Sequence, residues 1–277
     1  MTEKKKPELT EAEILKVKEK AAEMLGVCKK QNDIIGQQIF TILSRFARVI
    51  YYPLGKDDVW GFTRIKGSSK ETQGDKPFVA INSSIPLDCQ VFAAAHELYH
   101  IRYDEKMDVI PADIIDENVE DRNELKANRF AAEFLVEEDL LLKELRINSI
   151  EPAKIEIKDV LGLDFLFSVP FRTMARRLHE VKAISKADEA RYLSLTDEEI
   201  AAARNRYAVP APAADGRIAI DNLTDLAVKA YENQRITFEK LEYLLSLSKL
   251  SPLDVGIPIP ARNSFPSDSE LDAIMEE

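Results

Sequence analysis

Apolar residues recur at every third or fourth position near the start of the chain, a spacing that predicts amphipathic helices. A second apolar run follows between residues 34 and 46. Residues 1–46 are therefore expected to form N-terminal helices. The apolar positions of the first run are Ile14, Val17, Ala21, Met24 and Leu25.

The pattern changes after residue 46 to short runs of β-branched and aromatic residues. These runs cover residues 48–52, 59–65 and 77–82, and clusters of Gly, Pro, Asp and Ser separate them. Their length and composition are typical of strands. We expect them to form a small antiparallel sheet, with the polar stretch from 67 to 76 as a loop.

Helical patterns return after the sheet. Helices are predicted at about 87–104 and 118–146, joined by a loop, and again from residue 153. A stretch rich in Pro, Ala and Gly at 207–217 is typical of a linker. One or two further helices are predicted within 221–250, and the Pro-containing tail from residue 258 is expected to be mobile.

This order of elements predicts an α+β fold. The expected organisation has N-terminal helices over residues 1–46 and a core with the sheet and two helices over 47–150. A helical extension packed on the core would follow over 151–206. The linker, the C-terminal helices and the tail would occupy residues 207–277.

Composition and charge narrow the class of protein. The 277 residues carry a net charge of −11, from 38 basic and 49 acidic side chains, which argues against nucleic-acid binding. Cys28 and Cys89 match no metal or redox spacing, so reduced thiols in a cytosol are expected. The sequence shows neither a secretory signal nor 18 consecutive apolar residues. We therefore expect a cytoplasmic protein with no membrane and no direct nucleic-acid partner.

The most specific chemical motif is the HExxH pentapeptide from His96 to His100, which follows an apolar run at 91–95. Two histidines at i and i+4 lie on one face of a helix, so both imidazoles can reach one divalent metal ion. The glutamate between them, Glu97, is placed to accept a proton from a water molecule at that metal. The motif therefore predicts a catalytic zinc site.

A third ligand is needed, because catalytic zinc sites usually have three protein ligands and one open position. Lys106 stands where a third histidine would follow His100, so a carboxylate on the next helix is expected. Glu124 is one candidate, and Glu120, one turn earlier on the same face, is its rival. Spacing alone does not choose between them. Asn128, one turn after Glu124, is placed to hold a ligand as an outer partner.

The two motifs together resemble the ImmA/IrrE family of metallopeptidases. Its pattern is H-E-L-x-H, a variable stretch, and then E-x-x-A-N-x-F-A-A-x-x-L, which matches residues 124–135. In that pattern the first glutamate is the third zinc ligand, and it corresponds to Glu124. Two departures are Tyr99, where the family usually has glycine, and Val136-Glu137, where many members have Met-Pro.

The resemblance implies a zincin-like core that holds one Zn²⁺ per chain, with Mn²⁺ as a substitute in vitro. It also implies a role in transcription regulation, with a helix-turn-helix repressor as the protein substrate. Residues 1–46 lack a clear helix-turn-helix pattern, so a stand-alone protease is expected. The alternative is a non-catalytic regulator of zincin fold that binds a repressor or partner without hydrolysis. An intact Glu97 argues against that alternative.

Substrate binding is expected at the sheet. Zincins commonly bind a peptide as an added strand on a sheet edge. The strand expected to be that edge consists of Phe78, Val79, Ala80, Ile81 and Asn82. A donor for the oxyanion is also needed, and the sequence does not choose among Tyr51, Tyr52, Arg102, Tyr103 and His179.

Residues 165–185 resemble part of a helix-turn-helix, and they contain a local basic cluster of Arg172, Arg176 and Arg177. DNA recognition is one interpretation of this segment. The preferred interpretation is a helical hairpin packed against the catalytic core, because the chain as a whole is acidic.

Overall fold

The computed structural model describes residues 8–64, 76–104, 110–112, 122–152, 154–220, 222–248 and 250–259. These residues form eleven α-helices and a five-stranded sheet, so the predicted α+β class is confirmed. Contacts divide the chain into two compact units, Met1–Asp221 and Asn222–Glu277. Within the described ranges, no helix has the length and apolar character needed to cross a membrane.

The sheet is mixed, with the strand order β4-β2-β3-β1-β5. β1 (Arg48–Tyr52) pairs in parallel with β3 (Phe78–Asn82), whereas β2 (Gly61–Arg64) runs antiparallel to β3. β4 (Ile110–Ala112) and β5 (Ala219–Ile220) add antiparallel strands beside β2 and β1.

The expectation of a purely antiparallel sheet was therefore wrong. β3 enters between β1 and β2, and four of its five residues are buried, which suits a central strand. Alternation of apolar residues locates strands, but it fixes neither their order nor their direction. β4 and β5 also lie in segments that were expected to be a loop and the region after a linker, because both strands are too short to show a pattern.

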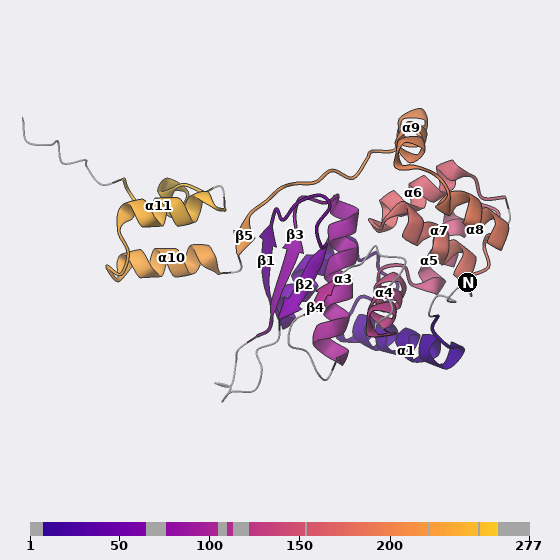
Figure 1. Cartoon of the computed structure of the whole chain (residues 1–277), viewed down its shortest axis with the longest axis horizontal. Helices are drawn as coiled ribbons and strands as arrows, with labels where there is room; N and C mark the ends of the chain where they lie inside the picture. The colour runs from indigo at the N-terminus through magenta and orange to yellow at the C-terminus, as the bar shows by residue number, and fades with distance from the viewer. Residues whose placement is uncertain are drawn as a thin grey trace, which may run out of the picture. The chain divides into compact units, whose positions relative to one another are not determined.

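Helix α3 (Leu87–Tyr103) lies between the sheet and α4 (Arg122–Leu135), and it also packs against α2 (Gln38–Phe46) (Figure 1). Residues 93–95 of α3 are fully buried alanines. Such small side chains let a helix approach its neighbours closely, because helix separation depends on the residues at the contact. This close packing brings together the helix that carries the HExxH motif and the helix that carries Glu124.

Helix α1 (Glu11–Cys28) packs along α4 (Figure 1). It begins with a capping box in which Thr10 and Glu13 satisfy each other's backbone N–H groups. Tyr99, which replaces the family's glycine, is 2% exposed and packs its ring against Phe130 of α4. Lys20 of α1 lies 5.0 Å above the Tyr99 ring, so this larger residue helps join α1 to α3.

The single helix predicted over 118–146 is instead two helices in the described part of that range. α4 ends at Leu135 and α5 (Glu138–Ile147) follows after a short turn. The Val136 carbonyl accepts from Nε and Nη2 of Arg177, at 3.2 and 2.8 Å. In a continuous helix that carbonyl would accept from the N–H four residues later. A contact across 41 residues of sequence thus replaces a helix bond, and local periodicity does not reveal it.

Four short helices complete the first unit: α6 (Ile157–Phe167), α7 (Phe171–Glu180), α8 (Lys186–Leu193) and α9 (Asp197–Tyr207). They pack on one another, and α7 contacts α4 through Arg177 and Glu133. Residues 208–218 have neither helix nor strand and lead to β5. These contacts agree with a packed hairpin for residues 165–185.

The second unit contains α10 (Leu223–Glu232), α11 (Phe238–Ser246) and a short 3-10 helix (Pro252–Val255). Ala227, Leu241 and Leu245 form its small core. Leu241 and Leu245 are fully buried. The unit thus has an apolar core of its own.

Candidate metal centre

His96, His100 and Glu124 converge between α3 and α4. One ligand atom from each of these buried residues lies within 4.8 Å of the others, so the group can hold a metal ion. The two histidine Nε2 atoms are 2.9 Å apart. Glu124 Oε2 is 3.0 Å from His96 Nε2, and Oε1 is 3.2 Å from His100 Nε2. Spacing on α3 and packing of α4 together create the cluster.

The outer nitrogen of each ring is held by an acceptor. His96 Nδ1 lies 2.9 Å from Asn128 Oδ1, and His100 Nδ1 lies 2.6 Å from Asp104 Oδ2. A carboxylate or amide oxygen only accepts, so each ring donates its N–H outward. When the rings are neutral, their Nε2 lone pairs therefore point inward, toward the other two ligands.

The inner face of the cluster thus contains acceptors without donors. Both Glu124 oxygens are buried and lack a hydrogen-bond donor among the described residues. Two imidazole lone pairs and a carboxylate repel one another unless a cation lies among them. This donor set of two histidines and one glutamate fits a divalent metal with an open position.

The pKa values of His100 and Glu124 are shifted because these ionisable groups lie close together in a buried site. Burial alone would lower the pKa of His100, but Asp104, Glu124 and Glu97 raise it to about 10. Burial alone would raise the pKa of Glu124, but His100 and His96 lower it to about 2. Without a metal, a proton on His100 takes the place of the cation, while Glu124 stays ionised.

Glu97 lies beside these ligands and is fully buried. Burial raises the pKa of its carboxyl group, an effect that the neighbouring histidines oppose. The Thr63 hydroxyl donates to Glu97 Oε2 at 2.5 Å, whereas Oε1 has no hydrogen-bond partner in the described part of the chain. Glu97 therefore keeps one oxygen free, as a proton acceptor requires.

Two residues of this site were missed in the sequence. Asp104 follows His100 by one helical turn, so the i, i+4 spacing would have located it. Thr63 is fully buried on β2, 34 residues before Glu97. Its only sequence signal is a polar residue at an inward-facing position of a strand, which is too common to be specific.

The strand from Phe78 to Asn82 is not a free edge. β3 pairs with β1 on one side and β2 on the other, so its backbone N–H and C=O groups are already used. Its assignment to substrate binding by strand addition was wrong, because strand addition needs an unpaired edge. Asn82 instead has a structural role: its side chain donates to the carbonyls of Gly55 and Val59.

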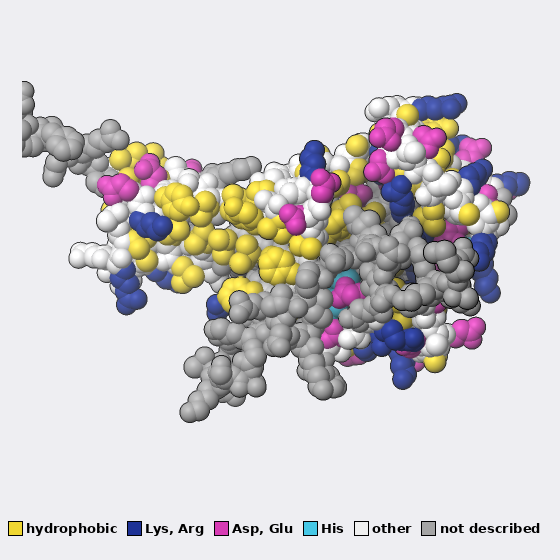
Figure 2. Space-filling model, viewed as in Figure 1, with side chains coloured by type: hydrophobic (Ala, Val, Ile, Leu, Met, Phe, Trp, Pro, Cys, Tyr) yellow, Lys and Arg dark blue, Asp and Glu magenta, His cyan; other side chains and the backbone are white. Residues whose placement is uncertain are grey.

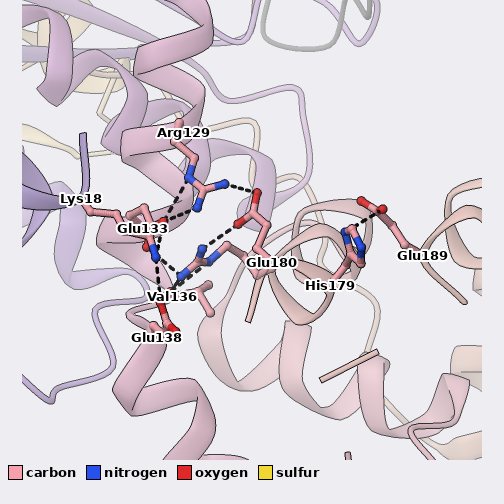
Figure 3. Close-up of polar contacts among 9 residues, drawn as sticks. Lys18, Arg129, Glu133, Val136, Glu138, His179, Glu180 and Glu189 are labelled. Carbon is pink, nitrogen blue, oxygen red and sulfur yellow. Dashed lines mark hydrogen bonds and ion pairs between the residues drawn. The ribbon is translucent and has the colours of Figure 1, made fainter. Parts of the chain in front are cut away.

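The rival ligand Glu120 lies outside the described residues. Several oxyanion candidates are engaged elsewhere: the Tyr103 hydroxyl donates to the Lys20 carbonyl at 2.9 Å, and His179 Nδ1 lies 3.0 Å from Glu189 Oε2 (Figure 3). The others are Arg102, over the Phe46 ring, Tyr51, under the Arg217 guanidinium, and Tyr52, which is 49% exposed.

Comparison with known proteins agrees with this geometry. Residues 47–179 match the Peptidase_M78 family model, described as the IrrE N-terminal-like domain. Neither a curated protein nor a solved structure matches the chain. The matched segment contains Glu97 and all three converging residues, and its family points to a peptidase. The resemblance inferred from the two motifs is confirmed: residues 47–179 belong to the ImmA/IrrE-type peptidase family.

Proposed function

We propose that this protein is a zinc-dependent endopeptidase with a zincin-like core. One observation carries the proposal: His96, His100 and Glu124 present only acceptors to a common point, beside a buried Glu97 with one free oxygen. Nitrogen and carboxylate ligands of this number suit Zn²⁺, and Mn²⁺ is the expected substitute in vitro. The one such group found among the described residues predicts one metal ion per chain.

Each group of the site has a different role in peptide hydrolysis. The metal, when bound, supplies Lewis acidity toward the scissile carbonyl and the attacking water. Glu97 Oε1 accepts a proton from the water and later returns it to the leaving amine. Asn128 and Asp104 keep the two imidazole rings in the orientation that ligation needs.

An extended peptide would bind on the sheet edge nearest to Glu97. β2 contacts both α3 and β4, and β4 is the outer strand on that side. No strand among the described residues pairs with its outer edge, which is where a peptide backbone could add. We propose pairing on β4 in place of β3, with a helix-turn-helix repressor as the substrate that the family suggests.

Two other classes of function are less well supported. A non-catalytic regulator would have no use for a buried carboxylate beside the metal ligands. A direct DNA-binding protein would present a continuous basic surface. On the face in Figure 2, basic and acidic side chains are intermingled over the helices from α6 to α9.

The test combines metal analysis with cleavage of a captured substrate. Glu97→Gln should bind one zinc ion per chain and retain the uncleaved repressor in a pull-down. That repressor is then incubated with wild type, with Glu97→Gln and with the exposed control Glu11→Gln, and products are identified by mass spectrometry. Cleavage should fall by at least about 10²-fold in Glu97→Gln alone. Equal repressor release from DNA by wild type and Glu97→Gln, without cleavage, would establish the regulator instead.

A further inference from the structure

Two residues of β2 meet the two oxygens of the Glu97 carboxylate. Gly61 and Thr63 are two positions apart, so they face the same side of the sheet, toward α3. The Thr63 hydroxyl bonds Oε2 at 2.5 Å. A Cβ atom on Gly61 would lie 3.4 Å from Oε1 and 3.0 Å from the Ala80 carbonyl oxygen.

We infer that Gly61 and Thr63 form a seat that positions Glu97 for proton transfer. This inference rests on the proposed peptidase function. Thr63 fixes the rotation of the carboxylate by bonding one oxygen, and Gly61, which has no side chain, lets β2 lie close to the Ala80 carbonyl and to the other oxygen. Both are positioning residues, since they act through Glu97: the Thr63 hydroxyl bonds it, and Gly61 lies beside its other oxygen.

The strength of the seat comes from burial. Thr63 and Glu97 are both 0% exposed, so water does not replace the hydroxyl if it is removed. A hydrogen bond to a charged group is stronger than one between neutral groups, and losing it inside a protein leaves the charge unpaired. Thr63→Val keeps the shape of the side chain but removes the donor, and Thr63→Ser restores the donor.

Acetohydroxamate is a suitable probe, because it binds a metal through two oxygens and gives a proton to a neighbouring carboxylate. Its affinity therefore depends on the position of Glu97 and needs no protein substrate. Cobalt-loaded protein would be titrated with acetohydroxamate, and binding followed by visible absorption. Metal content is measured in parallel, because neither residue is a proposed ligand and each variant should keep one ion per chain.

Thr63→Val should weaken acetohydroxamate binding about tenfold, as expected for one hydrogen bond to a charged group. Gly61→Ala should weaken it as well, because the added methyl group would lie 3.0 Å from the Ala80 carbonyl oxygen, so β2 must shift and carry Thr63 away from its place beside Glu97. Thr63→Ser should stay within about twofold of wild type, and Glu97→Gln should lose at least as much as Thr63→Val. Thr173→Val on α7 is the matched control and should bind like wild type.

Wild-type affinity in both Thr63→Val and Gly61→Ala, with Glu97→Gln impaired, would overturn the seat but leave the peptidase proposal intact. If Thr63→Val does not fold, the decision falls to Gly61→Ala against Thr63→Ser, and equal affinity in these two overturns the seat. A wild-type protein that binds no metal would overturn the proposed function as well, so the two failures are distinguishable.

Discussion

Helix α4 carries a buried glutamate near each end, and the two carboxylates are held in opposite ways. Glu133, near the C-terminal end, is 5% exposed and accepts from Arg177 Nη2 at 2.8 Å and Arg129 Nε at 3.0 Å (Figure 3). Glu124, near the N-terminal end, is 7% exposed but faces two imidazoles whose N–H groups point away. One carboxylate is surrounded by cations and the other by acceptors.

The difference shows why burial of a charge does not by itself identify a functional site. At Glu133 the donors are complete, and Arg129 and Arg177 also pair with Glu180 of α7. Such a network ties helices together and needs nothing further. At Glu124 the missing positive charge must come from outside the chain or from a proton. The count of donors against acceptors therefore separates a structural cluster from a metal centre.

The largest expected effect comes from removing each glutamate in turn. Glu124→Gln should lower zinc affinity by at least about 10³-fold, more than the loss typical of an outer partner. Glu133→Gln should leave zinc affinity within about threefold, because its carboxylate touches no ligand. Competition with a chelator measures both. Full zinc affinity in Glu124→Gln would remove that residue from the site and favour Glu120.

Arg177 tests the structural role of the cluster around Glu133. It is 1% exposed and bonds Glu133, Glu180 and the Val136 carbonyl. Arg177→Met should lower the free energy of unfolding by about 3–5 kcal/mol, because it leaves Glu133 buried beside fewer cations. Zinc content should not change in the folded protein. Urea unfolding followed by Trp60 fluorescence reports on the first unit, which contains the only tryptophan.

The neighbouring exposed residue provides the control for that measurement. Arg176→Met should change the free energy of unfolding by less than about 0.5 kcal/mol, as surface substitutions usually do. Equal effects of Arg176→Met and Arg177→Met would mean that the ion pairs of α4 and α7 contribute nothing specific. Loss of zinc in Arg177→Met would mean that the two ends of α4 are coupled.

Arg177 also shows where prediction from the sequence stops. It was grouped with Arg172 and Arg176 as a basic cluster, yet it is buried and bonded to residues 41 and 44 positions away. Local rules did predict the helix of the HExxH motif and the shared face of His96 and His100, because both depend on spacing within one turn. The partner of Glu97 on β2, the central place of β3 and the end of α4 depend on distant contacts. The spacing of apolar residues along the sequence does not predict such contacts.

Asp164 is an intermediate case between the two glutamates. It is 1% exposed, and Arg204 Nη2 donates to its Oδ2 at 2.8 Å, while Oδ1 has no partner in the described ranges. Burial raises the pKa of Asp164 to about 7, although Arg204 opposes the shift. This carboxyl group is therefore half satisfied, and its protonation should be visible in the stability of the fold.

The raised pKa of Asp164 predicts how the stability of the fold changes with pH, because protonation and folding are linked. Because the folded pKa lies above the unfolded value near 4, the stabilising contribution of Asp164 is full at about pH 4 and lost as pH rises through about 7. Between about pH 4.5 and 7.5, wild type should lose about 3 kcal/mol more stability than Asp164→Asn. Chelator is added to both proteins so that metal binding does not contribute. Parallel pH curves for the two proteins would show that Asp164 is ionised throughout.

The smallest effect is expected from the outer partners of the metal ligands. Asp104→Ala should lower zinc affinity by about 10–100-fold, because His100 loses the acceptor that orients its ring. Asp104→Asn should lose less, since an amide oxygen can still accept from Nδ1. Asn128→Ala should resemble Asp104→Ala, because it frees the ring of His96.

The pH dependence of the Asp104 effect distinguishes orientation from charge. In the metal-free protein Asp104 helps raise the pKa of His100 to about 10, so zinc must displace a proton at neutral pH. Wild-type affinity should therefore rise about tenfold per pH unit up to that pKa. In Asp104→Ala the pKa is lower, so the rise should stop at a lower pH. The gap between the two proteins should then widen from about pH 6 to pH 9, whereas a constant gap would mean that Asp104 acts on ring orientation alone.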